Sequence, residues 1–154
     1  MDHKDYMRRA LELAAQAAAE GDVPVGCVIV RDGEIIGEGR NRREENGDAT
    51  AHAELEAIRD ACRRVGSWRL HRCTMYVTLE PCPMCAGAML MAQLGQCVYG
   101  AADPRLGCCG SIYDLPDDPA LGGRTQWVAG VCAEECAALL QNFLREKRTE
   151  VRRG

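Results

Sequence analysis

The sequence predicts an α/β fold: a three-layer α-β-α sandwich in which helices cover both faces of a mixed sheet of about five strands. Two observations predict it. Two apolar segments early in the chain are joined by a tight turn, which indicates antiparallel strands. Two later apolar segments are separated by a helical segment long enough for a crossover, which indicates parallel strands. A sheet that contains both kinds of pair is mixed.

The first 40 residues are expected to form a helix and a hairpin. Apolar residues recur at helical spacing between Met7 and Ala18. The run VPVGCVIV at 23–30 is typical of a strand, and IIGEGR at 35–40 is typical of the returning strand. The turn between them is centred on Asp32-Gly33, a favoured hairpin sequence.

The middle of the chain is expected to contain a helix, a strand, a helix and a strand. After a polar loop at 41–49, Thr50 is a candidate N-cap for a helix with one apolar side. A strand follows at 73–79. Pro81 and Pro83 suit the start of the next helix, which is expected to run to about Gly95. The segment QCVYGA at 96–101 then completes a parallel βαβ unit.

The last third begins with a long segment without periodicity. Residues 102–124 are rich in Gly, Pro and Asp, and a loop of this length inside a compact domain is usually functional. The segment TQWVAGV at 125–131 predicts a short strand. A final helix is expected at about 133–148, overlapping a basic C-terminal tail at about 145–154.

Length and composition indicate one globular domain over residues 1–154. Hydrophobic residues make up 47% of the chain and charged residues 27%, which argues against disorder. No apolar run is long enough to span a bilayer, and the N-terminus lacks the apolar region of a signal peptide. We therefore expect a cytoplasmic protein. The net charge of −4 excludes a generic polyanion binder, so a nucleic-acid partner would need local basic patches.

The chain has ten cysteines, which in the cytoplasm are more often thiols or metal ligands than disulfides. Eight of them are interpreted as small hydrophobic residues, because most lie in apolar surroundings. Cys82 and Cys85 differ, since they stand in the sequence PCPMC at a predicted helix start. Cysteines three residues apart on a helix share one face, so both sulfurs can reach one metal ion.

A third ligand of the type that zinc prefers stands thirty residues earlier. His52 begins the sequence HAE near the start of another predicted helix. Three protein ligands leave a fourth position open, which is typical of catalytic rather than structural zinc. Glu54 does not share the helix face of His52, so it need not bind the metal and can transfer protons to and from the activated water.

Each part of this constellation has a simpler interpretation. His52 alone could be a polar residue at a helix start. Cys82 and Cys85 alone could form a thioredoxin-like redox pair. A fourth cysteine, Cys73 or Cys27, could close the site as structural zinc. The combination of HAE and PCPMC, each at a helix start with a strand between them, favours catalytic zinc.

These motifs resemble those of the cytidine deaminase-like superfamily, whose zinc enzymes carry H-x-E and P-C-x-x-C. The wider segments YVTLEPCPMCAGAML and YGAADPRLGCCGS are similar to those of bacterial tRNA-specific adenosine deaminases, with similarity from about Tyr6 to Arg148. The resemblance implies a cytidine deaminase-like fold. It also implies a hydrolase that converts adenosine to inosine at the wobble position of a tRNA anticodon.

By this resemblance, His52, Cys82 and Cys85 hold one zinc ion per subunit, with no organic cofactor. Activated water attacks C6 of the flipped adenine, and Glu54 transfers the protons. Asn41 matches a family residue that contacts the nucleoside, and Asp103 matches one in the loop beside the anticodon groove.

The resemblance also implies the partners. The family acts as a homodimer on the anticodon stem-loop of tRNA, a single-stranded loop with splayed bases. This chain lacks the arginine that many members have before the aspartate of this loop, and Arg105 is in a position to replace a family lysine. Arg145, Lys147 and Arg148 resemble the basic helix that meets tRNA, although basic residues also simply suit a helix C-terminus.

Two other functions stay open at this point. The same zinc machinery could deaminate a free nucleobase or nucleoside, guanine or cytosine. The chain could instead be a non-catalytic zinc-containing subunit that binds tRNA. The segments AGAM and AADPRLGCCGS and the basic tail favour tRNA over a free base, and Glu54 favours an enzyme over a non-catalytic subunit.

Overall fold

The computed structural model describes residues 1–153, with side chains as far as Val151; Gly154 and the side chains of Arg152 and Arg153, part of the predicted basic tail, lie outside the described residues. A mixed five-stranded sheet forms the centre, in the order β2-β1-β3-β4-β5. β1 pairs antiparallel with β2 and β3, whereas β4 pairs parallel with β3 and β5. The predicted sheet is thus confirmed, and its strands are β1 (Gly26–Arg31), β2 (Glu34–Arg40), β3 (Cys73–Leu79), β4 (Gln96–Ala101) and β5 (Gln126–Val128).

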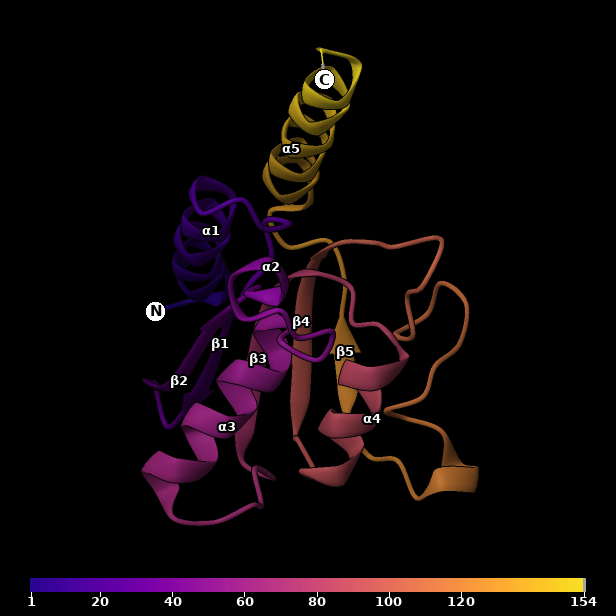
Figure 1. Cartoon of the computed structure of the whole chain (residues 1–154). Coiled ribbons are helices and arrows are strands. Elements are labelled where there is room, and N and C mark those ends of the chain that lie inside the picture. Colours follow the sequence, from indigo (N-terminus) through magenta and orange to yellow (C-terminus); the bar gives the residue numbers. More distant parts are fainter. Residues whose placement is uncertain (154) are drawn as a thin grey trace.

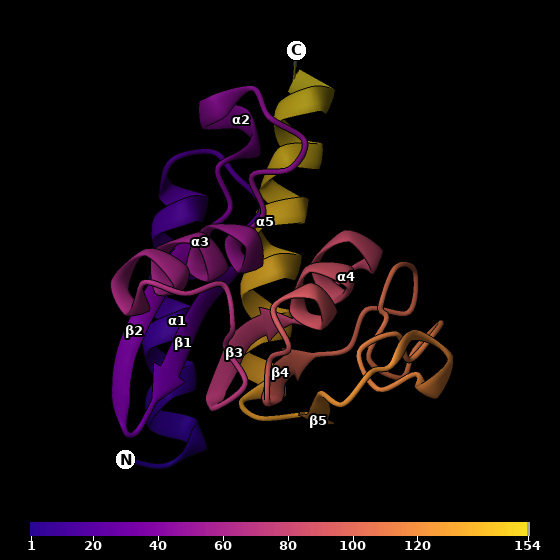
Figure 2. The same cartoon turned by 90° about the horizontal axis from the view of Figure 1, so that it is seen from below.

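Helices cover both faces of this sheet, as the sequence predicts (Figures 1 and 2). One face carries α1 (His3–Ala19) and the first turns of α5 (Ala133–Arg153); the rest of α5 projects beyond the sheet (Figure 1). The other face carries α3 (Ala53–Val65) and α4 (Pro83–Met91). The three-layer sandwich follows because each strand alternates its side chains between the two helical layers.

The alternation is visible along the central strands. Val28 and Tyr76 pack with Met7 of α1 in one buried cluster. Ile29 and Met75, one residue away on the same strands, pack with α3 and α4 in the other cluster. All ten cysteines are free; of the eight interpreted as hydrophobic, six are buried and two are half-buried. Of the described helices, none combines the length and the apolar character needed to cross a membrane.

Two glycines let α3 lie directly against the edge of the sheet. A Cβ atom on Gly39 would stand 2.2 Å from the carbonyl oxygen of Ala53, and one on Gly37 would stand 2.5 Å from that of Ala57. Any larger residue would therefore push α3 away from β2. This close packing fixes the start of α3, where His52 and Glu54 lie.

The start of α3 differs from the prediction. The N-cap is His52, not Thr50, and the helix begins at Ala53. The backbone N–H of Ala53 donates to Oδ1 of Asn41, 3.0 Å away, so a residue distant in sequence caps the helix. Thr50 instead donates its N–H and hydroxyl to the carboxylate of Asp48, which forms a local turn.

Other boundaries shift for local reasons. α4 ends at Met91 instead of about Gly95, because Gln93 adopts a left-handed conformation (φ 55°). α5 continues to Arg153, beyond the expected end at 148. The predicted polar loop at 41–49 contains a one-turn helix, α2 (Arg43–Asn46), and the long loop at 102–124 contains a short 3₁₀ turn, η1 (Pro119–Leu121).

Candidate metal centre and substrate pocket

The candidate site lies where the parallel strands β3 and β4 end. Chains leaving the carboxyl ends of parallel strands form a crevice at one edge of the sheet, the usual position of an α/β active site. β3 leads through Glu80 and Pro81 to Cys82, the N-cap of α4. The N-terminus of α3 lies beside it, with His52 as its N-cap. Two helix N-termini therefore point their partial positive charges at this crevice.

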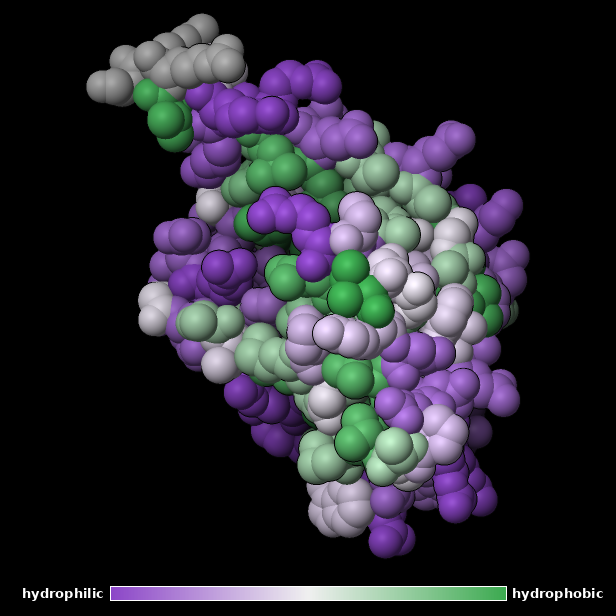
Figure 3. Space-filling model, turned by 90° about the vertical axis from the view of Figure 1, so that its right-hand side faces the viewer, coloured by the Kyte–Doolittle hydropathy of each residue, from purple (hydrophilic) through white to green (hydrophobic). Residues whose placement is uncertain are grey.

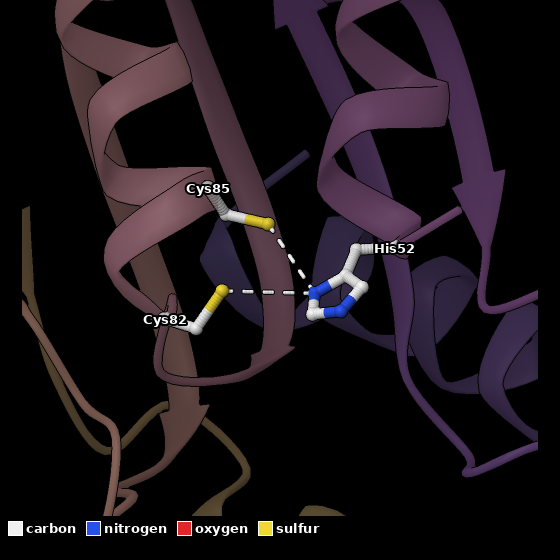
Figure 4. Close-up of side chains that lie close together, drawn as sticks. All are labelled: His52, Cys82 and Cys85. Atoms are coloured by element: carbon white, nitrogen blue, oxygen red, sulfur yellow. Dashed lines mark hydrogen bonds between the residues drawn. The ribbon is translucent and has the colours of Figure 1, made fainter. Parts of the chain in front are cut away.

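His52, Cys82 and Cys85 come together at these helix ends (Figure 4). Nδ1 of His52 lies 3.6 Å from Sγ of Cys82 and 3.5 Å from Sγ of Cys85. Zinc bonds of ordinary length at tetrahedral angles would place a nitrogen and a sulfur ligand about 3.5 Å apart. The three side chains thus fit one zinc ion.

Within residues 1–151, this is the one group of three or more His, Cys, Asp or Glu side chains close enough to share a metal. Cys27 and Cys73, the candidates for a fourth ligand, do not belong to it. A three-ligand set leaves a coordination position for water, as catalytic zinc requires. The arrangement therefore favours a catalytic over a structural metal site.

Of the two cysteines, only Cys82 is negatively charged in the metal-free site. A hydrogen bond from the Cys85 thiol, assisted by His52, lowers the pKa of Cys82 to about 4. The same hydrogen bond, together with burial, raises the pKa of Cys85 well above its ordinary value. At neutral pH Cys82 is therefore a thiolate and Cys85 still carries its proton, which a bound zinc ion would have to displace.

Glu54 lies in the first turn of α3 and is buried, with 4% of its surface exposed. Burial raises the pKa of its carboxyl to about 7, and the nearby charge of Cys82 adds to the shift. Glu54 does not belong to the ligand group. A carboxyl that titrates near pH 7 beside a metal site is suited to accepting and donating protons during a reaction.

A pocket of about 120 Å³ opens onto these groups. It is much smaller than the ~300–1,000 Å³ typical of sites for drug-sized ligands, so it suits one heterocyclic base better than a whole nucleotide. The walls combine apolar and polar side chains from five separate segments of the chain. They are Val23, Val25, Asn41, Arg43, His52, Glu54, Leu79, Glu80, Cys82, Asp103 and Leu106.

Asn41, predicted to contact substrate, is a buried wall of this pocket. Its Oδ1 accepts the hydrogen bond from Ala53 that caps α3. We therefore expect Asn41 to contact a substrate through Nδ2, a hydrogen-bond donor.

Asp103, the second predicted substrate residue, also lines the pocket. Its Oδ1 accepts hydrogen bonds from the backbone N–H groups of Arg105 (3.0 Å) and Leu106 (3.3 Å). Asp103 therefore also shapes the turn on which Leu106 reaches the pocket.

The predicted RNA contacts lie outside the pocket. Arg105 is exposed on the same loop as Asp103, and Arg145, Lys147 and Arg148 are exposed on α5. A second cavity, of about 570 Å³, lies between the end of α1, α2 and α5 and contains Lys147 and Phe143. Val23 and Arg43 line both cavities. These two residues therefore connect the pocket with the basic part of α5.

Sequence reasoning did not identify Arg43, Glu80 or Leu106 as site residues. Arg43 belonged to a predicted polar loop, and nothing in its spacing distinguishes it from the other charged residues there. Glu80 stands directly before PCPMC, and this position is the one feature of the sequence that could have marked it as a site residue. Leu106 reaches the pocket through an irregular loop, whose path no periodicity predicts.

The chain is similar to a known family and to known proteins. The model of the cytidine and deoxycytidylate deaminase zinc-binding region matches residues 1–101. A tRNA-specific adenosine deaminase of Bacillus subtilis (strain 168) is 44% identical over 143 residues, which cover 93% of this chain and 89% of the relative.

Solved structures are similar as well. One, from a study of A-to-I editing by tRNA:A34 deaminases at the wobble position, has 39% identity and a TM-score of 0.85, covering 88% of this chain and 99% of the other. A guanine deaminase from Bacillus subtilis has 38% identity and a TM-score of 0.63, covering 81% of this chain and 72% of the other.

Proposed function

Since this chain belongs to the zinc-binding cytidine and deoxycytidylate deaminase family, and within it to the tRNA-specific adenosine deaminases, we propose that it converts adenosine to inosine at the wobble position of a tRNA anticodon. One observation carries the proposal. A zinc-type ligand set and a buried carboxyl with a pKa of about 7 share a pocket sized for a single base. Because its substrate is tRNA, we expect the enzyme in the cytoplasm.

The pocket residues suggest how the reaction proceeds. His52, Cys82 and Cys85 would hold the zinc ion, which when bound would supply an activated water as the nucleophile. Glu54 accepts a proton from the attacking water and passes it to N1 of the adenine ring. The water oxygen bonds to C6. Glu54 then carries the proton of the new hydroxyl to the amino group, the bond between C6 and that nitrogen breaks, ammonia leaves and inosine remains.

The other walls hold the base. Val25 and Leu79 offer apolar surface to the flipped ring, and Nδ2 of Asn41 offers a donor. Arg43 lines both the pocket and the larger cavity that extends to α5. We infer that Arg43 meets a phosphate of the anticodon loop, and that Arg105 and the basic side chains of α5 meet the loop further out.

The first test is an assay with an RNA anticodon stem-loop that carries a wobble adenosine. We expect the zinc-loaded protein to produce inosine in this RNA, detected by mass spectrometry after nuclease digestion. A stem-loop with the adenosine moved by one position is the matched control and should remain unchanged. Free adenosine, cytidine and guanine are assayed in parallel. Ammonia release from guanine without inosine in the RNA would contradict the proposed substrate and favour the guanine deaminase relatives.

We also propose that the enzyme is a homodimer, in which α4 contributes to the interface. α4 has the sequence PMCAGAMLM, without a charged residue, although Met91 at its end is 69% exposed. Ile112 and Tyr113, in the adjacent loop, are also exposed. Figure 3 shows apolar side chains gathered in a band across this side of the molecule. An apolar surface of this kind is typical of an interface between subunits.

Replacing Met91 with glutamate is expected to dissociate the dimer, because the charge would lie in the apolar interface. We expect a shift from dimer to monomer in sedimentation velocity at micromolar concentration. The matched control is Trp68→Glu, which changes an exposed apolar residue in the loop after α3 and should leave the dimer intact. A monomeric wild type would contradict the proposal, as would a Met91→Glu variant that remains dimeric.

A further inference from the structure

Glu80 is a buried carboxylate that the mechanism above does not use. It lies between β3 and Cys82 with 2% of its surface exposed. All its side-chain hydrogen bonds come from one loop. Oε1 accepts from the N–H of Asp103 (3.0 Å) and the hydroxyl of Ser111 (2.5 Å), and Oε2 accepts from the N–H groups of Cys109 (2.9 Å) and Ser111 (3.1 Å).

The loop is wrapped tightly around this carboxylate. A Cβ atom on Gly107 would stand 2.3 Å from Cδ of Glu80, so only glycine allows the approach. The loop has two further hydrogen bonds to the rest of the fold: Cys108 N–H donates to the carbonyl of Pro81 (2.9 Å), and the hydroxyl of Tyr99 donates to the carbonyl of Cys109 (2.9 Å). Between Asp103 and Gly107 the order comes from Glu80 and from local turns, such as the hydrogen bond from Gly107 N–H to the carbonyl of Asp103 (2.9 Å). Three loop N–H groups would lose their partner if the carboxylate were removed, and buried donors without partners are costly.

The same loop forms one side of the pocket. Asp103 and Leu106 both line it, and Leu106 is 57% exposed, so burial does not hold Leu106 in place. Its position instead follows from the turn around Asp103, whose backbone N–H is bound to Glu80. A buried carboxylate is costly unless its hydrogen bonds are made, and here they are made only in this loop conformation.

We propose that Glu80 is a positioning residue, whose carboxylate fixes the loop at 103–111 so that Asp103 and Leu106 meet the RNA around the target base. This inference rests on the proposed function, because it assigns the loop to RNA binding. It adds a residue whose side-chain hydrogen bonds go to the loop and not to the metal ligands, and which controls the affinity for RNA through the loop.

The test is Glu80→Gln, which keeps the size of the side chain. Each oxygen of the Glu80 carboxylate accepts a hydrogen bond from at least one backbone N–H group of the loop. Whichever of these oxygens the glutamine –NH₂ group replaces, it cannot accept that hydrogen bond, so at least one hydrogen bond to the loop is lost. For zinc-loaded protein acting on the stem-loop, we expect the KM to rise about tenfold while kcat stays within about threefold. Amide hydrogen exchange should accelerate in residues 103–111 and remain unchanged elsewhere. The zinc content should remain one ion per chain.

The matched control is Glu38→Gln, which removes a partly buried carboxylate paired with Arg9 at the far edge of the sheet. It should change neither KM nor exchange in the loop. If Glu80→Gln does not fold, Ser111→Ala removes one donor, keeps the charge and should raise KM in the same direction by a smaller factor.

Several results would overturn the proposal. One is amide hydrogen exchange in residues 103–111 of Glu80→Gln that stays as slow as in the wild type. Another is a loss of kcat in this variant with KM unchanged. Loss of zinc with normal loop exchange would mean that Glu80 supports Cys82 instead. The exchange measurement requires no RNA. A wild type that fails to edit the stem-loop would therefore contradict the proposed function, while the exchange data still decide whether Glu80 fixes the loop.

Discussion

Replacing Glu54 with glutamine is expected to reduce kcat for inosine formation by about 10³-fold, because the amide cannot transfer protons between the water and the base. The zinc content should not change, since Glu54 lies outside the ligand group. KM for the RNA stem-loop should change little, because glutamine keeps the size of the side chain. The measurement is single-turnover editing of the stem-loop with zinc determined on the same sample.

The matched control is Glu56→Gln, the same substitution two residues further along α3. Glu56 lies near Arg42 (3.6 Å) and does not line the pocket. Its replacement should leave kcat within about threefold of the wild type. If Glu54→Gln kept more than about a tenth of the wild-type kcat, proton transfer by Glu54 would not be the basis of catalysis.

Glu54→Gln should also increase the free energy of unfolding of the protein after zinc has been removed with a chelator. Burial raises the pKa of Glu54 from 4.5 to about 7, so the folded state disfavours the charged carboxylate. Below pH 4.5 the group is protonated in both the folded and the unfolded state and costs nothing. Between pH 4.5 and 7 the cost grows to about 3 kcal/mol of unfolding free energy. Urea unfolding of Glu54→Gln and wild type should therefore differ by about this amount at pH 8 and converge at pH 4.5.

Replacing Cys85 with alanine is expected to abolish both zinc binding and activity. The side chain is fully buried beside His52 and Cys82, so no other thiol can take its place. We expect zinc content to fall from one ion per chain to near zero, kcat to fall by about 10³-fold or more, and the melting temperature of the as-purified protein to fall, because bound zinc stabilises the folded state. Metal analysis, the editing assay and calorimetry measure these effects.

The affinity for zinc should also increase as the pH rises. The pKa of Cys82 is lowered to about 4, so this thiol has already lost its proton at neutral pH. The pKa of Cys85 is raised, so its proton must leave when zinc binds. Release of the Cys85 proton makes the apparent dissociation constant about tenfold smaller for each pH unit between pH 6.5 and 8. The hydrogen bond to Cys82 raises the pKa of His52, so its imidazolium must also lose a proton, and the dependence is steeper at the lower end of this range.

The matched control for Cys85→Ala is Cys62→Ala, which changes a half-buried cysteine of α3 away from the site. Zinc content and the pH dependence should remain as in the wild type. A Cys85→Ala protein that still bound one zinc ion per chain would contradict the assignment of the ligands.

The sequence alone was sufficient for much of the fold. Alternating and helical apolar patterns are local properties, so the five strands and the helices could be predicted close to their observed positions. The start of α3 and the end of α4 could not be predicted from the sequence. α3 begins at Ala53 because Asn41 caps it from another segment, and α4 ends early because of the conformation of Gln93.

The metal ligands were also predictable, for a chemical reason. Cysteines three residues apart share a face of a helix, and zinc prefers sulfur and imidazole ligands. Residue types and spacing therefore identified His52, Cys82 and Cys85 before their positions were known, and the structure brings all three together.

Only the tertiary structure decided what surrounds the metal site. Arg43 and Leu106 reach the pocket from irregular segments, and Glu80 acts through hydrogen bonds to residues more than twenty positions away. The pKa of Glu54 depends on burial by the packed helices and strands, which no local pattern encodes. Spacing along one helix is determined by its own sequence, whereas the walls of the pocket depend on how distant segments pack together.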